Sequence, residues 1–567
     1  MPTIIDKFEK SVTAYGRRVA LAYIQGDKYH HIDYNTLNNH RLQIANWWSK
    51  LGFIQGQKVS VMLPNSPEWI IVDLVSVTLG LTMVPLHTTY NHVQLNRVIE
   101  HAQVDYLIVN QEYFDEHKEP FLKYPFKKII IVGLSDDDSV AHWPVLKYKK
   151  DIPQIKTKVL ESDLHTIIYT SGTTGDPKGV MLSHQNLVSD VESAKRNIDI
   201  KEADKFFSFL PLSHAFERAA GYYSAIFSGA SIYFAQNSKT IIEDIKKAKP
   251  TILTSVPRIF EKVYDKIFDK IGSGKAWKKK MFYHSLKLSR LSKSGKLSFL
   301  EKIQLNLLDK IVLDKIRNTL GGHLRMAVSG GASLNPTIAK FFENIGLPII
   351  EGYGLTETSP IVAVNKLDNY KFGTVGSILD CNKVKIADNK EIIISGDNIM
   401  MGYYDNPKAT EESIKDGWFY TGDLGFIDED NFLTIIGRAK DIIVLSTGKN
   451  IFPEPIENAL NESRYINQSF VYGDNNKNLS VLIVPDLEEL AIWCRKNEAD
   501  FSFPDVLKDN KILGLYEQKI VQKLKDFTGV EKVKNFILTD KEFNQENGLL
   551  TPTLKLRRKM IKDMYNL

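Results

Sequence analysis

The run from Tyr169 to His184, YTSGTTGDPKGVMLSH, decides the fold of this chain. Seven of its first eleven residues are Ser, Thr or Gly, and it contains one lysine, Lys178. The mainly apolar stretch before it, residues 166–169, predicts a β-strand. A loop of this composition after a strand can turn backbone N–H groups and hydroxyls toward an anion, with one cation in reach. We therefore predict a nucleotide triphosphate site; a flexible surface loop is the alternative.

The loop does not fit a Walker A phosphate loop, because Pro177 precedes Lys178 and Gly179 follows it. It resembles the phosphate-binding signature of the adenylate-forming superfamily, which includes acyl-CoA synthetases, luciferases and the adenylation domains of peptide synthetases. The resemblance covers nearly the whole chain. It implies an α/β fold with a large N-terminal domain of mixed and parallel sheets with flanking helices, and a smaller, mobile α+β C-terminal domain.

The bulk composition is that of an ordinary globular protein. The 567 residues are 43% hydrophobic and 25% charged, and the net charge of +5 is too small to indicate a nucleic-acid partner. Two cysteines, Cys381 and Cys494, exclude a disulfide framework and indicate a reducing, cytoplasmic setting, with both as buried filler. The N-terminus has no apolar core of a secretory signal. Residues 74–86 are too short to span a membrane and predict a buried helix that runs into a strand.

Alternating helical and strand patterns organise the first part of the chain. A helix is predicted over 36–51, and strands over 58–63, 104–109 and 128–132. Buried β-branched runs between helices favour a mostly parallel α/β sheet. A hairpin-like stretch around Gly422 and Gly425 precedes a predicted boundary after Arg438. We expect an N-terminal AMP-binding domain over 1–438 and a C-terminal domain over 439–567, with strands at 469–472 and 480–484 and helices at 455–460 and 512–527.

The segment 262–317 is rich in Lys and Arg, with apolar residues such as Trp277, Phe282 and Leu288 interleaved. A basic amphipathic helix can lie on an anionic membrane surface, which suits an enzyme whose substrate partitions into lipid. The alternative is a solvated helical face whose apolar side packs on the main body.

Two segments bear on the acyl substrate. Residues 210–218, LPLSHAFER, resemble the superfamily segment whose histidine and aromatic residue line the acyl pocket, here His214 and Phe216. Some bacterial relatives have a tryptophan gate four residues beyond the histidine, and this chain departs from them with Arg218. Residues 255–263, SVPRIFEKV, look typical of long-chain acyl-CoA synthetases. The plain alternative is a helix start with Ser255 as N-cap and a proline in the first turn.

Two further motifs, MAVSGGASL at 326–334 and EGYGLTET at 351–358, flank the adenine in the superfamily. The resemblance implies that glycines of the first contact one face of the base and Tyr353 stacks on the other. It implies that Thr356 meets the α-phosphate and Glu357 holds Mg²⁺, a cation that prefers hard oxygen ligands. The implied ATP and AMP site comprises Thr170, Ser171, Gly172, Thr173, Thr174, Gly175, Lys178, Gly330, Gly331, Glu351, Gly352, Tyr353, Gly354, Thr356, Asp423 and Arg438.

The last motifs lie around and beyond the predicted boundary. Asp423 resembles the aspartate that accepts hydrogen bonds from the ribose hydroxyls, with a turn aspartate as the alternative. Arg438 looks like the family's ribose- and phosphate-proximal arginine. Lys440 matches the hinge position, and Gly448 matches the glycine that approaches the pantetheine arm of coenzyme A.

Lys555 resembles the C-terminal lysine that enters the site during adenylation. The commonest family form has glycine before this lysine, and this chain has Leu554. The alternative is a basic tail, since Arg557, Arg558 and Lys559 follow.

The resemblance implies that ATP activates a long-chain fatty acid as acyl-AMP, and that coenzyme A then forms the thioester. The implied catalytic residues are Lys555, Thr356, Glu357 and Lys178, with ATP, Mg²⁺ and coenzyme A as cofactors or co-substrates. Alternatives are a fatty acyl-AMP ligase, an aryl- or medium-chain acyl-CoA ligase, and, more distantly, a non-catalytic fatty-acid or nucleotide-binding protein. Acyl chain length and oligomeric state stay open, a homodimer included.

Overall fold

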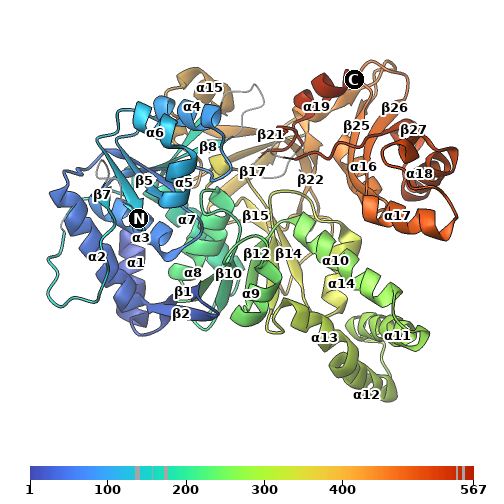
Figure 1. Cartoon of the computed structure of the whole chain (residues 1–567), viewed down its shortest axis with the longest axis horizontal. Coiled ribbons are helices and arrows are strands. Elements are labelled where there is room, and N and C mark those ends of the chain that lie inside the picture. Colours follow the sequence, from blue (N-terminus) through green and yellow to red (C-terminus); the bar gives the residue numbers. More distant parts are fainter. Residues whose placement is uncertain (134–140, 156, 171–176, 545–546, 552–555) are drawn as a thin grey trace. The chain divides into compact units, whose positions relative to one another are not determined.

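The computed structural model describes residues 1–133, 141–155, 157–170, 177–544, 547–551 and 556–567. The chain divides into two compact units (Figure 1). The first comprises Met1–Lys385, Ile393–Tyr420 and Asp428–Leu433, and the second comprises Ile386–Ile392, Thr421–Ile427 and Thr434–Leu567. The α/β class and the division into a larger and a smaller part agree with the prediction.

An eight-stranded sheet of the first unit holds the phosphate-loop strand. Its order is β19-β9-β8-β4-β3-β5-β6-β7. Strands β3 to β6 pair in parallel, and β8, β9 and β19 pair antiparallel at one edge. The bounds are β3 Lys58–Met62, β4 Thr82–Pro85, β5 Tyr106–Asn110, β6 Lys128–Val132, β7 Ala141–His142, β8 Leu164–Thr170, β9 Lys178–Ser183 and β19 Gly402–Tyr403. Residues in the middle of β3, β5 and β6 are buried, as expected for a sheet covered on both faces.

A nine-stranded sheet forms the rest of the first unit, with the order β16-β15-β14-β13-β12-β10-β11-β1-β2. Its centre, from β14 through to β1, is parallel, and both edges are antiparallel. The bounds are β1 Val19–Gln25, β2 Lys28–Asp33, β10 Lys205–Ser208, β11 Ser231–Phe234, β12 Ile252–Ser255, β13 Met326–Ser329, β14 Ile349–Tyr353, β15 Ala363–Val364 and β16 Ser377–Ile378.

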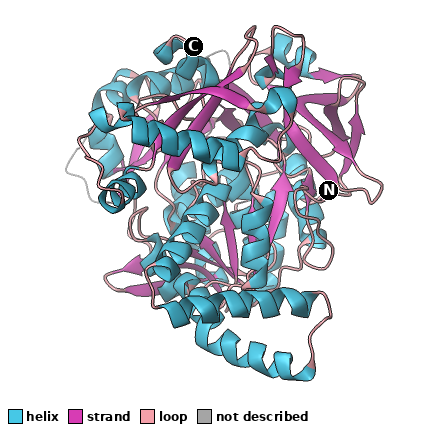
Figure 2. Ribbon diagram, turned by 90° about the vertical axis from the view of Figure 1, so that its right-hand side faces the viewer, coloured by secondary structure: helices cyan, strands magenta, loops and turns pink. Residues whose placement is uncertain are grey.

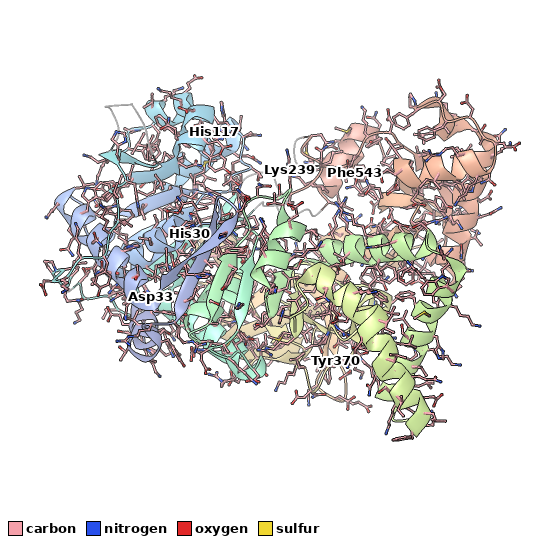
Figure 3. All side chains as sticks on the ribbon, turned by 60° about the horizontal axis from the view of Figure 1, so that its bottom comes forward. His30, Asp33, His117, Lys239, Tyr370 and Phe543 are labelled. Carbon is pink, nitrogen blue, oxygen red and sulfur yellow. The ribbon has the colours of Figure 1, made fainter. Side chains whose placement is uncertain are left out.

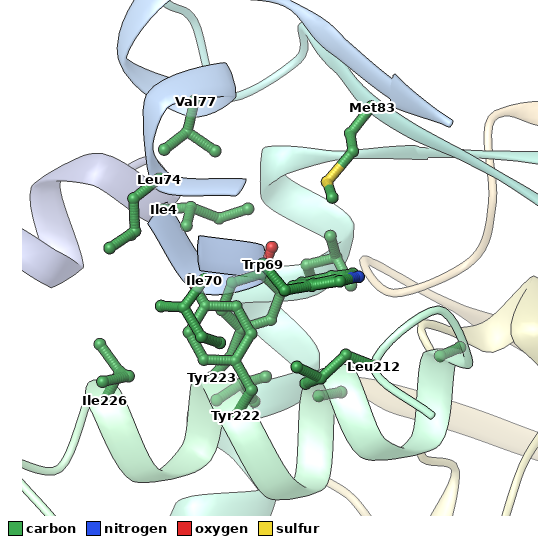
Figure 4. Packing of buried hydrophobic residues seen from close by; sticks show 14 of the residues in the cluster. Ile4, Trp69, Ile70, Leu74, Val77, Met83, Leu212, Tyr222, Tyr223 and Ile226 are labelled. Carbon is green, nitrogen blue, oxygen red and sulfur yellow. The ribbon is translucent and has the colours of Figure 1, made fainter. Parts of the chain in front are cut away.

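Helices cover these sheets. They include α1 Ile4–Tyr15, α2 Tyr34–Lys50, α3 Pro67–Leu79, α4 His92–Ala102, α5 Gln111–Glu116, α6 Lys118–Lys123, α7 His184–Asn197, α8 Ser224–Ile226, α9 Ile241–Ala248, α13 Asp314–Arg317, α14 Pro336–Asn344 and α15 Pro407–Ser413. Helix α3 is buried on all sides, and Gly80 ends it in the left-handed region at φ 64°. This confirms the buried helix-to-strand reading of 74–86. In its core, Trp69 meets Tyr222 edge-on at 6.3 Å between ring centroids (Figure 4).

A fully buried ion pair links α3 to the π-helix η1 (Glu217–Tyr223). Arg218 donates to Asp73, to the Thr166 hydroxyl at 2.8 Å and to His165 Nε2 at 2.7 Å. The Arg218 guanidinium holds the pKa of Asp73 well below its usual range against the opposing effect of burial. Arg218 therefore neutralises a buried carboxylate, and its guanidinium lies inside the first unit and not on its surface.

The basic segment folds as helices α10 (Pro257–Gly272), α11 (Ala276–Lys293) and α12 (Phe299–Leu308), as its amphipathic pattern predicted (Figures 1 and 2). Ser255 is not the N-cap of α10. It ends β12, where it pairs with Ser329, and Val256 occupies the N-cap without a side-chain cap. No helix among the described residues combines the length and apolar character that crossing a membrane requires.

Helix α11 is fixed to α14. Lys293 Nζ lies 3.0 Å from Glu343 of α14, and the Ser289 hydroxyl donates to the Asn344 carbonyl at 2.6 Å. The hydroxyl of Tyr370, which is labelled in Figure 3, also donates to the Glu343 carboxylate. Phe282 and the neighbouring apolar side chains of α11 complete this contact in a shared hydrophobic cluster.

The boundaries between the two units fall within the strands of a five-stranded sheet, in which β20 and β21 pair antiparallel. Its order is β17-β18-β21-β20, with β22 paired to β21. The bounds are β17 Asn382–Ile386, β18 Glu391–Gly396, β20 Ile414–Lys415, β21 Trp418–Ile427 and β22 Leu433–Arg438. The hairpin expected around Gly422 and Gly425 is thus present as β21 and β22.

The second unit also contains the sheet β25-β26-β27, with bounds Ile466–Tyr472, Leu479–Pro485 and Val533–Leu538. Its helices are α16 Pro453–Asn461, α17 Leu487–Lys496, α18 Asn510–Lys523 and α19 Arg558–Tyr565, with the two-stranded β23 Ile443–Val444 and β24 Asn450–Ile451 nearby in sequence. Arg558 is not part of a solvated basic tail. Its Nη2 lies 2.5 Å from Glu457 Oε2, and its Nε lies 3.9 Å from Asp441.

The two cysteines are far from equivalent in exposure. Cys494 is fully buried in the hydrophobic cluster of the second unit. Cys381 is half-buried in the first unit, and burial raises the pKa of its thiol to about 12. Neither thiol ionises readily, and both are free.

Candidate active site

Three predicted motifs of the first unit, one for the acyl substrate and two for the nucleotide, follow adjacent parallel strands. β12, β13 and β14 lie side by side, and the segments after them carry Val256, Gly330 with Gly331, and the 354–357 turn. The carboxyl ends of parallel strands meet at one edge of a sheet, which is the usual place for ligands in α/β folds. The topology therefore gathers these motifs at one edge.

Gly330 lies directly against Phe216. A Cβ atom built on Gly330 would approach the Phe216 ring to 2.9 Å, so only glycine leaves room for this ring. The following Gly331 has φ +86°, which also favours glycine. His214 Nδ1 accepts a hydrogen bond from the Phe216 N–H at 3.3 Å. The residue predicted for the acyl pocket and the glycine predicted for the adenine therefore touch.

Glu351 ties the glycine loop to β14. Its Oε2 accepts from the Leu334 N–H at 3.0 Å, and its side chain is almost fully buried. Burial raises the pKa of Glu351 to about 7, although the hydrogen bond from Leu334 opposes this. The next residues, Gly352 and Tyr353, pair with β15, so the strand holds the aromatic residue at its end.

Lys178 and Glu357 meet at one tyrosine, Tyr403. Lys178 Nζ lies 4.7 Å from the Tyr403 ring centroid, and the Tyr403 hydroxyl donates to Glu357 Oε1 at 2.9 Å. Backbone pairing fixes the arrangement, because Tyr403 of β19 pairs with Val180 of β9 and the Met400 N–H donates to the Glu357 carbonyl at 2.9 Å. A cation and a carboxylate predicted from motifs far apart in sequence thus contact the ring and the hydroxyl of one tyrosine.

Backbone pairing and close packing constrain the segments next to Lys178 and Glu357. Thr170 ends β8 opposite Lys178, and Thr356 begins a short 3₁₀ turn that contains Glu357. A Cβ on Gly354 would lie 1.6 Å from the Pro360 carbonyl oxygen, so no larger residue fits there. Five predicted phosphate-loop residues lie outside the described part of the chain, namely Ser171, Gly172, Thr173, Thr174 and Gly175.

A second buried carboxyl, that of Glu217, lies within the predicted acyl segment 210–218. Glu217 accepts from the Ser208 and Thr254 hydroxyls, each at 2.7 Å. Burial raises the pKa of Glu217 to about 8, against these two hydrogen bonds. The group therefore carries a proton at neutral pH and ties β10 and β12 to η1.

The other predicted residues lie in the second unit. Asp423 Oδ1 accepts from Arg438 Nε at 2.7 Å, so these two predicted ribose-site residues are joined to each other. Lys440 lies in the 3₁₀ turn 439–441, and its side chain is exposed. Gly448 has φ +75° in the turn between β23 and β24, with open space at its Cβ position. Lys555 lies outside the described residues.

The described residues contain no cluster of three or more His, Cys, Asp or Glu side chains arranged for a metal. A magnesium ion in a nucleotide site is commonly held by one or two carboxylates together with substrate phosphates, so it does not require such a cluster. Glu357 is half-buried, and Tyr403 takes one of its two carboxylate oxygens. The residues present therefore fit a magnesium ion shared with a nucleotide.

Tyr403 was not among the predicted site residues. A signal for it exists in the sequence, since two consecutive tyrosines follow a glycine in MGYYDNP at 401–407. That pattern alone does not distinguish a site residue from a strand aromatic. Only the pairing of β19 with β9 shows which of the two tyrosines reaches Glu357.

Comparison with known proteins identifies the family. The family model of AMP-binding enzymes matches residues 8–404, and the model of the AMP-binding enzyme C-terminal domain matches residues 440–513. The chain therefore belongs to the AMP-binding, or adenylate-forming, enzymes.

Among its relatives, the chain is similar to the long-chain-fatty-acid–CoA ligase FadD15 of Mycobacterium bovis, with 32% identity over 531 residues, covering 91% of this chain and 88% of that protein. It is 31% identical over 601 residues to the rat long-chain-fatty-acid–CoA ligase 5, covering 98% and 86%. Among solved structures, the adenylation domain of a carboxylate reductase from Mycobacterium chelonae matches with a TM-score of 0.78 at 22% identity, covering 100% and 90%. This last likeness shows the fold alone.

Proposed function

We propose that this chain is an AMP-forming long-chain-fatty-acid–CoA ligase. The observation that carries the proposal is the Lys178–Tyr403–Glu357 arrangement, which places a cation and a carboxylate at the edge where the adenylate-forming motifs gather. Relatives named as long-chain-fatty-acid–CoA ligases match over most of the chain and support the substrate class.

In the first half-reaction, the fatty acid carboxylate attacks the α-phosphorus of ATP, acyl-AMP forms and pyrophosphate leaves. Lys178, Thr356 and Lys555 stabilise the negative charge that shifts onto the phosphates, and no covalent enzyme intermediate is required. Glu357 would hold Mg²⁺, which when bound neutralises phosphate charge. The half-buried ring of Phe216, which lies against Gly330, would separate the acyl chain from the adenine.

In the second half-reaction, the thiol of coenzyme A attacks the acyl carbonyl and AMP leaves. The thiolate is the nucleophile and comes from coenzyme A, which agrees with two enzyme cysteines that ionise poorly. We further propose the functional boundary at 438/439, with rotation about Lys440 removing Lys555 and bringing Gly448 toward coenzyme A. Asp423 and Arg438 bind the ribose in this scheme.

The cellular setting is part of the same proposal. The enzyme works in the cytoplasm and contacts the cytoplasmic face of a membrane through the basic segment 262–317, where its fatty acid substrates partition. The oligomeric state is not needed for the scheme, and a homodimer is compatible with it.

The test is pyrophosphate release across fatty acids from short to very long chains, and benzoate, each with and without coenzyme A. Turnover that depends on coenzyme A and peaks on long chains is the expected result. Pyrophosphate release without thioester would assign an acyl-AMP ligase, and a peak on benzoate or medium chains would assign the corresponding CoA ligase. Binding of ATP and oleate without any release would assign a non-catalytic binding protein.

A further inference from the structure

Helix α12 is unusual because none of its residues is buried. Phe299 and Leu300 are 77% and 71% exposed, and Ile303 and Leu307 are 52% and 59% exposed. Exposed apolar residues are ordinary when they are scattered, but four on one ten-residue helix form a contiguous patch.

The four side chains lie on one face of the helix. Phe299, Ile303 and Leu307 are spaced by four residues, and Leu300 lies next to the first of them, so all four fall within about 100° of the helical circumference. The half-buried residues Leu305 and Leu308 lie on the opposite side. The helix packs against α11 and the following π-helix η2 (Asp309–Leu313), at the lower edge of the first unit in Figure 1. Its most apolar face therefore points away from the protein.

The sequence that contains α11 and α12 is strongly basic. Between Lys275 and Leu308 the chain carries nine Lys or Arg residues and one acidic residue, Glu301. Trp277 and Tyr283 of α11 are also more than half exposed, at 57% and 56%. Tryptophan and tyrosine favour the boundary between lipid headgroups and acyl chains, while lysine can extend its charge to the headgroups.

We propose that α12 docks on an anionic membrane surface, with Phe299, Leu300, Ile303 and Leu307 entering the headgroup boundary and the lysines of α11 contacting lipid phosphates. This inference rests on the proposed function for its biological purpose, since a fatty acid substrate partitions into lipid. It goes beyond a basic segment that attracts membranes, because it names the inserting helix and its face.

Charge and shape favour a lipid surface over a protein partner. An amphipathic helix with an apolar face and a basic surround binds anionic bilayers by burying that face while its cations meet the headgroups. The electrostatic attraction between the lysines and the anionic lipids weakens as salt is raised, whereas the contribution of the apolar face to membrane binding does not. The anchoring of α11 through Lys293 and Ser289 gives the inserted helix a firm base on the first unit.

The experiment is flotation of the full chain with vesicles of phosphatidylcholine alone or with added phosphatidylglycerol. The test variant is Phe299→Gln/Leu300→Gln/Ile303→Gln, which keeps helix propensity and disturbs no buried residue. The control variant is Ile54→Gln/Leu122→Gln/Val145→Gln, since these side chains are 64%, 51% and 84% exposed on other segments. A further variant, Lys278→Glu/Lys280→Glu, changes charge alone.

We expect binding to anionic vesicles that is about tenfold weaker or more for the α12 variant and unchanged for the control. The charge variant should lose the preference for phosphatidylglycerol, and raised salt should weaken the wild type in the same way. Equal flotation of the α12 and control variants, or equal wild-type binding to both vesicle types, would overturn the proposal. If the wild type forms an oligomer that the α12 variant alone fails to form, the exposed face would instead be assigned to contact with a second copy of the chain.

Activity measured without vesicles separates this inference from the proposed function. With detergent-dispersed fatty acid, the α12 variant should form acyl-CoA at the wild-type rate. An inactive wild type that still floats would refute the ligase proposal and leave the docking surface intact. A fully active wild type that does not float with vesicles would support the ligase proposal and refute the docking surface.

Discussion

Tyr403→Phe is the sharpest test of the site, because it deletes one hydroxyl and retains the ring. The change removes the hydrogen bond to Glu357 Oε1 at 2.9 Å, while the aromatic face beside Lys178 remains. If Glu357 holds Mg²⁺, the phenol orients that carboxylate. Its loss should then weaken the metal site more than it changes the fold.

The structure sets the size of the effect. A hydrogen bond to a charged group contributes ~1.5–3 kcal/mol, and the half-buried position of Glu357 favours the lower end. A loss of about 1.5 kcal/mol corresponds to roughly tenfold. We expect the Mg²⁺ concentration for half-maximal pyrophosphate release to rise about tenfold, with a smaller change in kcat at saturating Mg²⁺.

The neighbouring tyrosine supplies the matched control. Tyr404 also has a lysine over its ring, with Lys58 Nζ 4.8 Å from the centroid, and Lys58 donates to the Tyr404 hydroxyl at 2.7 Å. Tyr404→Phe should leave the Mg²⁺ dependence unchanged. The positioning role of Tyr403 is refuted if its variant titrates with Mg²⁺ like the wild type, or if both variants shift alike.

Three further outcomes follow from other residues. Lys555→Ala should slow acyl-AMP formation by about 10²–10³ and spare thioester formation from supplied acyl-AMP, whereas equal loss in both half-reactions would contradict its assignment. Asp73→Asn leaves Arg218 buried without its counter-ion, so urea unfolding should show a loss of ~3–5 kcal/mol; an unchanged midpoint would mean that neutral hydrogen bonds suffice. Burial raises the pKa of Glu217 from 4.5 to about 8, and the unfolded chain therefore releases this proton first as the pH rises. Wild-type stability should fall between about pH 4.5 and 8, and thermal melts of Glu217→Gln should show a flatter profile; parallel curves for the two proteins would disprove this contribution.

Local patterns were sufficient for most of the fold. The predicted strand 128–132 has the bounds of β6, because its run of buried β-branched residues strongly favours a strand. The strand predicted from 104 begins at Tyr106 instead, because the Val104 N–H bonds to the Ile99 carbonyl and so belongs to the end of α4. The alternative reading of Ser255 as an N-cap is wrong, because a serine two residues before a proline is also found at a strand end, and only the pairing with β13 separates the two.

In the candidate site, too, local motifs predict some residues, while others depend on contacts between distant parts of the chain. The resemblance names Lys178 and Glu357 from short, ordered motifs, and their roles stay predictions. Nothing local shows that Tyr403 joins them, because this depends on strand pairing between segments far apart in sequence. The exposed face of α12 is likewise a property of packing, since its apolar pattern equally predicts a helix that faces the core.

The two poorly reactive thiols have a practical consequence for the proposed domain rotation. Cys494 is sealed in a hydrophobic cluster, and the raised pKa of Cys381 keeps that sulfur protonated at the pH where maleimides are used. Cysteines introduced at exposed positions would therefore be labelled selectively in an otherwise native chain. A donor and an acceptor dye placed on the two units would report their separation in real time as ATP, fatty acid and coenzyme A are added in turn.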